Sequence, residues 1–335
     1  MKGQNQNMDN TTKQKLSLFV ENTNDLKKEF VWQNALVRRL VAMQYAKTSK
    51  PVDCEAIQRC HKLIKESTGV FSTFRGNLVL FVAALLSMSN DPRKQFDDTL
   101  KVYGLLKETR LRASDYLVVA AYEIAAQANP YDFVHAADRT RAFYDGMKSN
   151  RFFLTGYDDY IFAAMLGLSD LDVVSGTERI ERLYSRLKGE FWDRNSTQAL
   201  AQVLVLGGSD DTAIERVLAL RDAFRERKIK MDKSYTLSTL GILAMLPVEI
   251  DTIVHDIGEA FNYMRAQKGF GPWSVTTQEL LLFAAGIVAY ELAKNISDGV
   301  LSATLSTSIA NIIIAQQAAM IAAVSASTAA AAASS

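Results

Sequence analysis

Six lysines recur along this chain at an almost constant interval. The spacings between successive members are 42, 41, 40, 40 and 40 residues, and the six are Lys65, Lys107, Lys148, Lys188, Lys228 and Lys268. Each lysine stands near the end of an amphipathic segment, and a small, apolar run follows it. A fixed period of about 40 residues is typical of stacked helix pairs. The repeat therefore predicts an all-α protein built as an α-solenoid.

Two kinds of helix are expected to alternate within this repeat. The longer helices are amphipathic, as in the segment that carries Ile180, Leu183 and Leu187. The shorter helices are apolar nearly all round and rich in Ala and Gly, which is typical of buried helices that approach one another closely. We expect the shorter helices to begin near Leu78, Tyr116, Tyr160, Ala199, Tyr235 and Leu280. The pattern predicts about six antiparallel helix pairs with helical caps at both ends.

The chain divides into four segments on composition. Residues 1–10 are polar and are expected to be disordered, and residues 11–67 are expected to form an N-terminal helical cap. Residues 68–295 carry the helix pairs. Residues 296–335 are expected to form an uncharged, Ala-rich C-terminal helix and tail, because no charged residue follows Asp298.

The charge balance limits the partners that the chain can attract. It has 38 basic and 37 acidic side chains, which gives a formal net charge of +1. No overall field therefore draws in nucleic acid, and we expect no nucleic-acid partner. The first twelve residues contain no apolar segment of the kind found in signal peptides, so the expected location is cytoplasmic.

No motif for catalysis, nucleotide binding or metal binding stands out. The three histidines fall in different repeats, and neither GxxxxGK[ST] nor GxGxxG occurs. Cys54 and Cys60 are six residues apart, so on one helix they would not share a face. We expect no cofactor and no catalytic residue, with both cysteines acting as small buried hydrophobic residues.

Paired carboxylates at Asp158 and Asp159 form one candidate site. They follow Thr155 and Tyr157 and come directly before the apolar helix expected at Tyr160. Two carboxylates could hold a divalent cation or act as acid and base. Asp115 stands at the matching place one repeat earlier, so a structural role at the start of a helix is the favoured interpretation.

Aromatic residues mark several junctions between repeats. They occur in the loops 71–77 and 269–273, and at Phe152–Phe153 and Phe191–Trp192, with arginines nearby. If these loops share one edge, the edge has the aromatic and arginine side chains of a binding surface. Alternatively, the aromatic residues seal the junctions. The candidate binding residues are Arg75, Thr155, Tyr157, Asp158, Asp159, Tyr160, Trp192 and Trp273.

The periodic lysines and the tail each allow two interpretations. The lysines could form a charged row that binds an acidic partner, or they could stabilise the C-terminal ends of helices, which is favoured. The apolar run at 309–324 could insert in a membrane or associate with another copy, but Asn311, Gln316 and Gln317 interrupt it. A packed capping helix is the favoured interpretation of the tail.

Three features together resemble a known bacterial family. They are the segment RFFLTGYDDYIFAAML at 151–166, the sequence FRGN at 74–77 and the uncharged, Ala-rich tail. They are similar to the family catalogued as domain of unknown function 4003, over nearly the whole chain. The resemblance implies a soluble bacterial protein of about this length, and it implies no activity and no catalytic residue.

These observations favour a non-enzymatic binding or scaffolding protein that recognises a protein or peptide. One alternative is an envelope-associated protein, held at the inner face of the membrane by its C-terminal tail. Another alternative is a metal-dependent enzyme with an α/α-toroid-like site around Asp158 and Asp159. Exposed terminal repeats can pair, so a homodimer formed through the tail is also left open.

Overall fold

The chain is all-α, as the sequence predicts. The computed structural model describes residues 8–151, 154–209, 211–233 and 236–297. Within these ranges the chain forms fourteen α-helices and two short 3₁₀ helices, and no strand.

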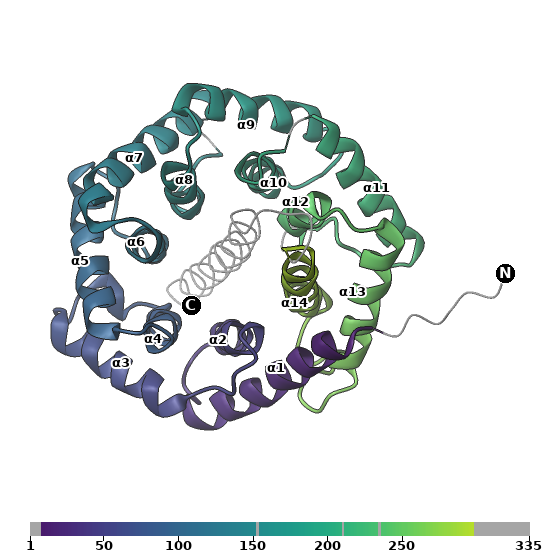
Figure 1. Ribbon diagram of the computed structural model, residues 1–335, viewed down its shortest axis with the longest axis horizontal. Helices are drawn as coiled ribbons and strands as arrows, with labels where there is room; N and C mark the ends of the chain where they lie inside the picture. Colours follow the sequence, from purple (N-terminus) through teal and green to yellow (C-terminus); the bar gives the residue numbers. More distant parts are fainter. Residues whose placement is uncertain (1–7, 152–153, 210, 234–235, 298–335) are drawn as a thin grey trace, which may run out of the picture.

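The helices form two concentric layers (Figure 1). The outer helices are α1 (Asn10–Glu29), α3 (Cys54–Ser67), α5 (Pro92–Glu108), α7 (Phe133–Asn150), α9 (Val173–Leu187), α11 (Thr212–Glu226) and α13 (Ile250–Arg265). The inner helices are α2 (Ala35–Lys47), α4 (Val79–Ser87), α6 (Asp115–Gln127), α8 (Asp159–Leu168), α10 (Arg194–Leu206), α12 (Leu237–Met245) and α14 (Thr277–Ser297). The 3₁₀ helices η1 (Thr73–Arg75) and η2 (Pro130–Asp132) lie in connecting loops.

The apolar pattern of each segment explains its layer. Every residue from Val79 to Leu86 in inner helix α4 is buried, whereas outer helix α9 buries a stripe that includes Ile180 and Leu183. Small residues bring the layers together: a Cβ atom on Gly167 of α8 would lie 2.9 Å from the backbone nitrogen of Thr140 in α7. The two helix backbones are therefore in direct contact there.

The repeat closes into a ring, which differs from the expected open solenoid. Helix α1 packs against α13 and α14, and α2 packs against α14 (Figure 1). The ring centroid of Phe19 in α1 lies 5.7 Å from that of Phe270 and 5.2 Å from that of Phe283. Residues 11–67, expected as a cap, supply the first pair and the outer helix of the second. Over the described ranges the ring has seven pairs, because α1 and α2 repeat the same unit.

Two ion pairs join the first and last pairs of the ring. Lys15 Nζ lies 2.9 Å and 3.0 Å from the two carboxylate oxygens of Glu291, and both side chains are only 2% exposed. Arg39 of α2 pairs with Glu279 of α14, and its other terminal nitrogen donates to the carbonyl of Ser274 at 3.1 Å. Charged side chains therefore lie inside the contact that closes the ring.

All outer helices run in the same direction, and each begins with an acid and ends with a base. Their N-caps are Asp9, Asp53, Asp91, Asp132, Asp172, Asp211 and Glu249. Their last turns hold Lys27 and Lys28, Lys65, Lys107, Lys148, Arg186, Arg225 and Arg265. Both placements agree with the polarity of the helix dipole.

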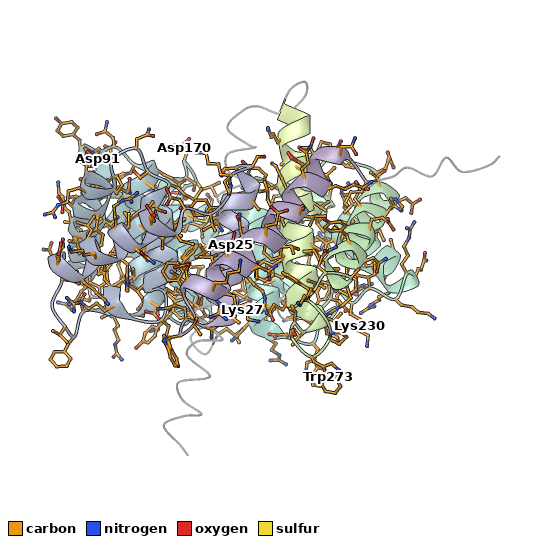
Figure 2. All side chains as sticks on the ribbon, turned by 90° about the horizontal axis from the view of Figure 1, so that it is seen from below. Asp25, Lys27, Asp91, Asp170, Lys230 and Trp273 are labelled. Atoms are coloured by element: carbon orange, nitrogen blue, oxygen red, sulfur yellow. The ribbon has the colours of Figure 1, made fainter. Side chains whose placement is uncertain are left out.

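The ring consequently has two chemically different faces. The acidic face holds the N-terminal ends of the outer helices, with Asp91 and Asp170 in Figure 2. The basic face holds their C-terminal ends and the loops that lead to the inner helices, with Lys27, Lys230 and Trp273 in Figure 2. The periodic lysines all lie at the basic face, near the ends of outer helices.

Arginines fix the loops of the acidic face by donating to backbone carbonyls. Each comes from an outer helix and reaches the loop that follows the next inner helix. The contacts run from Arg139 to Gly167, Ser169 and Leu171, from Arg179 to Ser209, and from Arg216 to Leu246 and Val248. These arginines also recur once per repeat, but they are held by backbone carbonyls, whereas the periodic lysines are mostly exposed.

Candidate functional site

The basic face carries the tryptophans of the chain. The sequence has three, and Trp32, Trp192 and Trp273 are 98%, 98% and 102% exposed. Phe71, in the α3–α4 loop, is 102% exposed. Tryptophan is highly buried on average in folded proteins, so an unpartnered set on one face indicates a contact surface. Trp273 points away from the ring in Figure 2.

The aromatic residues are spread around a broad face. Trp273, Trp32 and Phe71 lie in the α13–α14, α1–α2 and α3–α4 loops, which belong to neighbouring helix pairs. Val31 and Val70 precede two of them and are also exposed, so these loop tips are apolar. Trp192 lies further round the ring, in the α9–α10 loop. We refer to Val31, Trp32, Val70, Phe71, Trp192 and Trp273 as the apolar tips.

The loops also contain buried aromatic residues, so both interpretations of the junctions apply to different members. Phe74 is buried against Phe96 and Tyr103, with ring centroids 5.5 Å and 5.0 Å away. Phe191 and Phe270 are buried in their own loops. Phe152–Phe153 lie outside the described residues. One aromatic residue seals the junction while its neighbour in the loop faces solvent.

Exposed lysines lie on the same face of the ring as the apolar tips. Lys27 and Lys28 extend the periodic series back by one repeat. Over the described ranges, five members of the original series have no ion-pair partner, namely Lys65, Lys107, Lys188, Lys228 and Lys268. Their positions satisfy the helix dipole, and their ammonium groups remain available to an anionic surface.

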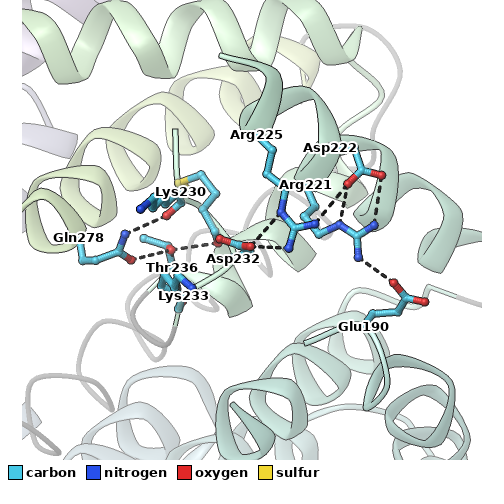
Figure 3. Close-up of polar contacts among 10 residues, drawn as sticks. Glu190, Arg221, Asp222, Arg225, Lys230, Asp232, Lys233, Thr236 and Gln278 are labelled. Carbon is cyan, nitrogen blue, oxygen red and sulfur yellow. Dashed lines mark hydrogen bonds and ion pairs between the residues drawn. The ribbon is translucent and has the colours of Figure 1, made fainter. Parts of the chain in front are cut away.

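Two acids on the basic face, Glu190 and Asp232, are bound by arginines (Figure 3). Arg221 Nη1 lies 2.8 Å from Glu190, and Arg225 Nη2 lies 2.6 Å from Asp232. Both arginines also contact Asp222. These pairs neutralise carboxylates that would otherwise weaken the positive potential of the neighbouring lysines.

The structure brings Asp159 into a buried polar contact between inner helices. Its carboxylate accepts from the backbone nitrogen of Gly156 at 2.8 Å and from the amides of Gln198 and Gln202 at 2.9 Å and 2.5 Å. Burial, and then the charge of Asp158, raise the pKa of Asp159 to about 6. The carboxylate therefore joins α8 to α10.

The neighbouring predicted residues are only partly accessible. Thr155 and Tyr160 are buried, and the Tyr160 hydroxyl accepts from the backbone nitrogen of Arg112 at 3.2 Å. Tyr157 is 41% exposed and its hydroxyl accepts from the Arg112 guanidinium. Asp158 is the N-cap residue of α8, but its side chain makes no capping hydrogen bond, which differs from the expected capping role.

Arg75 is not free to bind a partner as the sequence suggests. Its guanidinium donates to the carbonyls of Lys65 and Thr68 and to the Thr68 hydroxyl at 3.3 Å. It therefore satisfies the open C-terminal end of α3. Of the eight candidate residues, Trp192 and Trp273 are fully exposed at the basic face and Tyr157 is partly exposed there.

Two features of the described residues bear on the alternative functions. Among the described residues, no group of three or more His, Cys, Asp or Glu side chains is placed to hold a metal ion. No helix in the described part of the chain has the length and apolar character needed to cross a membrane. The tail at 298–335, to which the membrane and capping interpretations refer, lies outside the described residues.

Sequence reasoning missed Trp32 as a surface residue. Trp32 falls within residues 11–67, which were expected to form a helical cap, but it lies in the loop between α1 and α2. Asn34 is the available signal, because its side chain caps α2 by accepting from the backbone nitrogen of Leu36 at 2.8 Å.

Fold and surface together define a class: a closed ring of antiparallel helix pairs with a basic, aromatic face. The model of the family described as Protein of unknown function (DUF4003) matches residues 22–318, and the chain belongs to this family. No curated protein and no solved structure matches the chain.

Proposed function

We propose that this protein is a non-enzymatic binding module that docks its basic face on an anionic membrane surface. The observation that supports the proposal most directly is the exposure of all three tryptophans beside unpaired lysines on one face. Tryptophan favours the boundary between lipid and water, and lysine is attracted to anionic headgroups.

The distribution of charge supports one orientation on the membrane. Each exposed lysine near an anionic surface contributes about 1 kcal/mol. The acidic face is repelled by the same surface, so the ring would lie with its basic face towards the lipid. The apolar tips would then enter the interfacial region, while the lysines contact phosphate groups.

The breadth of the surface favours a membrane over a peptide. A peptide is usually recognised in a groove or along a strand edge, with its anchor side chains close together. The apolar tips instead lie on loops from four helix pairs, including Trp192 away from the other three loops. A protein partner with a broad acidic surface is the competing explanation and is separated by the test below. This contact uses loops and does not depend on a tether at 296–335.

The test is binding of the full chain to lipid vesicles. Sedimentation would compare phosphatidylcholine vesicles with vesicles that contain phosphatidylglycerol. We expect binding only to the anionic vesicles, a decrease in binding with salt, and a blue shift of tryptophan emission. Replacing Lys27, Lys228 and Lys268 together by Gln removes about 3 kcal/mol, or roughly a hundredfold in partition. The variant Trp32→Ala/Trp273→Ala is also expected to bind more weakly.

Matched controls come from the other face. Tyr131 is 94% exposed on the acidic side, so Tyr131→Ala removes a comparable aromatic side chain without affecting the proposed contact. The triple replacement of Lys50, Arg93 and Lys94 by Gln matches the loss of charge. If anionic vesicles leave the protein in the supernatant, or if both sets of variants lose binding equally, the membrane proposal is wrong.

A further inference from the structure

A second candidate site lies away from the basic face, where α2, α4, α5, α6 and α14 meet. It is a cavity of about 430 Å³, within the size range of small-molecule sites. The described residues that line it are Gln44, Lys47, Thr48, Leu85, Met88, Ser89, Asn90, Gln95, Tyr122 and Tyr290.

Lys47 is the only charged residue among the described residues that line this cavity. Its Nζ is buried and has no hydrogen-bond partner in the described structure. The nearest favourable contact given by the geometry is the Tyr290 ring, whose centroid lies 5.5 Å from Nζ. Burial lowers the pKa of Lys47 to about 7, and an anion bound in the cavity would stabilise the charged ammonium form. A buried amine that has no hydrogen-bond partner and lines a cavity therefore points to a ligand.

The other polar groups of the cavity can donate hydrogen bonds. The Nε2 atoms of Gln44 and Gln95 are also buried and have no hydrogen-bond partner within the described residues. Thr48 and Ser89 add hydroxyl groups to the lining. Three unsatisfied nitrogen atoms around one cavity match the oxygen acceptors of an anion.

Nearby carboxylates already have partners. Glu291 pairs with Lys15, and Glu123 accepts from Gln127 Nε2 at 2.7 Å. Burial also raises the pKa of Glu123 to about 7, so its negative charge is weakened near neutral pH. Glu123 is close enough for its charge to attract Lys47, but neither carboxylate lines the cavity, so Lys47 is the charge that faces a ligand there.

We propose that this cavity binds a small organic acid, with the carboxylate on Lys47 and the apolar part against Leu85, Met88, Tyr122 and Tyr290. The single lysine selects a monoanion, and the tyrosine rings and aliphatic side chains provide the apolar wall. The site is independent of the proposed membrane contact, because it uses none of the apolar tips.

The test measures binding of butyrate and benzoate to the full chain by ligand-observed NMR, with butyramide and benzamide as uncharged analogues. We expect at least one acid to bind at millimolar concentration, at least tenfold more tightly than its amide. Lys47→Met should abolish this preference. Lys50→Met is the matched control, because Lys50 is exposed nearby and does not line the cavity.

Each outcome is decisive for the wild-type protein, even if Lys47→Met fails to fold. If neither acid binds, or if acid and amide bind equally, the proposal is wrong. If a folded Lys47→Met variant retains the acid preference, the lysine does not form the site. Vesicle binding by the same preparation reports separately on the basic face.

Discussion

The buried ion pair between Lys15 and Glu291 offers the sharpest test of ring closure. Both side chains are 2% exposed, and the ammonium group also lies 4.8 Å from the Tyr290 ring centroid. Removing one partner leaves the other charge buried, which costs about 3–5 kcal/mol. We therefore expect Lys15→Met and Glu291→Leu each to lower the free energy of unfolding by that amount. The variant with both replacements should lie within about 2 kcal/mol of the wild type, because no charge remains buried.

The control has the same bond length in a different environment. Lys28 Nζ lies 2.9 Å from Asp25, also on α1, but the two side chains are 72% and 53% exposed. Lys28→Met should cost much less than Lys15→Met or Glu291→Leu, because solvent screens the pair.

The assay is urea unfolding followed by circular dichroism, with the four proteins of the Lys15/Glu291 cycle compared at one pH and ionic strength. With these single and double costs, the cycle should give a coupling energy of about 4 kcal/mol or more. Single replacements that cost no more than Lys28→Met would refute the reasoning. They would mean that α1 and α14 do not enclose the pair and that the ring is open in solution.

The packing and the buried charges lead to three further predictions. Gly167→Ala should destabilise the protein by about 1–3 kcal/mol, because the added methyl group meets the α7 backbone at Thr140. Gly104→Ala should instead stabilise α5 by up to about 1 kcal/mol, because no atom lies within 4 Å of the added carbon; thermal unfolding compares the two variants. Burial lowers the pKa of Lys47 from 10.5 to about 7, so between these pH values the unfolded chain binds more protons than the folded one. The free energy of unfolding should therefore rise with pH in this range, and Lys47→Met should remove that rise in urea titrations. Burial raises the pKa of Asp159 from 3.8 to about 6, so stability should fall as pH rises through this window. Asp159→Asn should reduce this slope in the same titrations, leaving the part due to Glu123, while costing about 1–3 kcal/mol through mismatched hydrogen bonds.

Local patterns were enough to predict the alternation of outer and inner helices. The lysine period gave the ends of the outer helices, because a base at that position is favoured by the helix dipole. The apolar runs gave the inner helices, with Leu237 and Val79 beginning helices within two residues of the expected starts at Tyr235 and Leu78. Both patterns act within one repeat, so they are readable from the chain alone.

Ring closure could not be predicted in the same way. It depends on contacts between residues far apart in sequence, such as Lys15 and Glu291, which have no local signature. Curvature is set by small rotations at each helix pair, and these come from packing. Similarly, Arg75 has the composition of a binding residue, but the distance to the end of α3 decides that it satisfies backbone carbonyls.

Closure also changes how this repeat protein should unfold. A linear array has terminal repeats with one neighbour each, and these can fray first. In the ring, α1 and α14 give the first and last pairs a second neighbour, so no pair is a natural starting point for fraying. The first pair is synthesised long before its final partner, and its closing surface waits until α14 has left the ribosome. Completion of the ring is therefore a late event for the growing chain. Once the ring is closed, we expect it to unfold as a single cooperative unit.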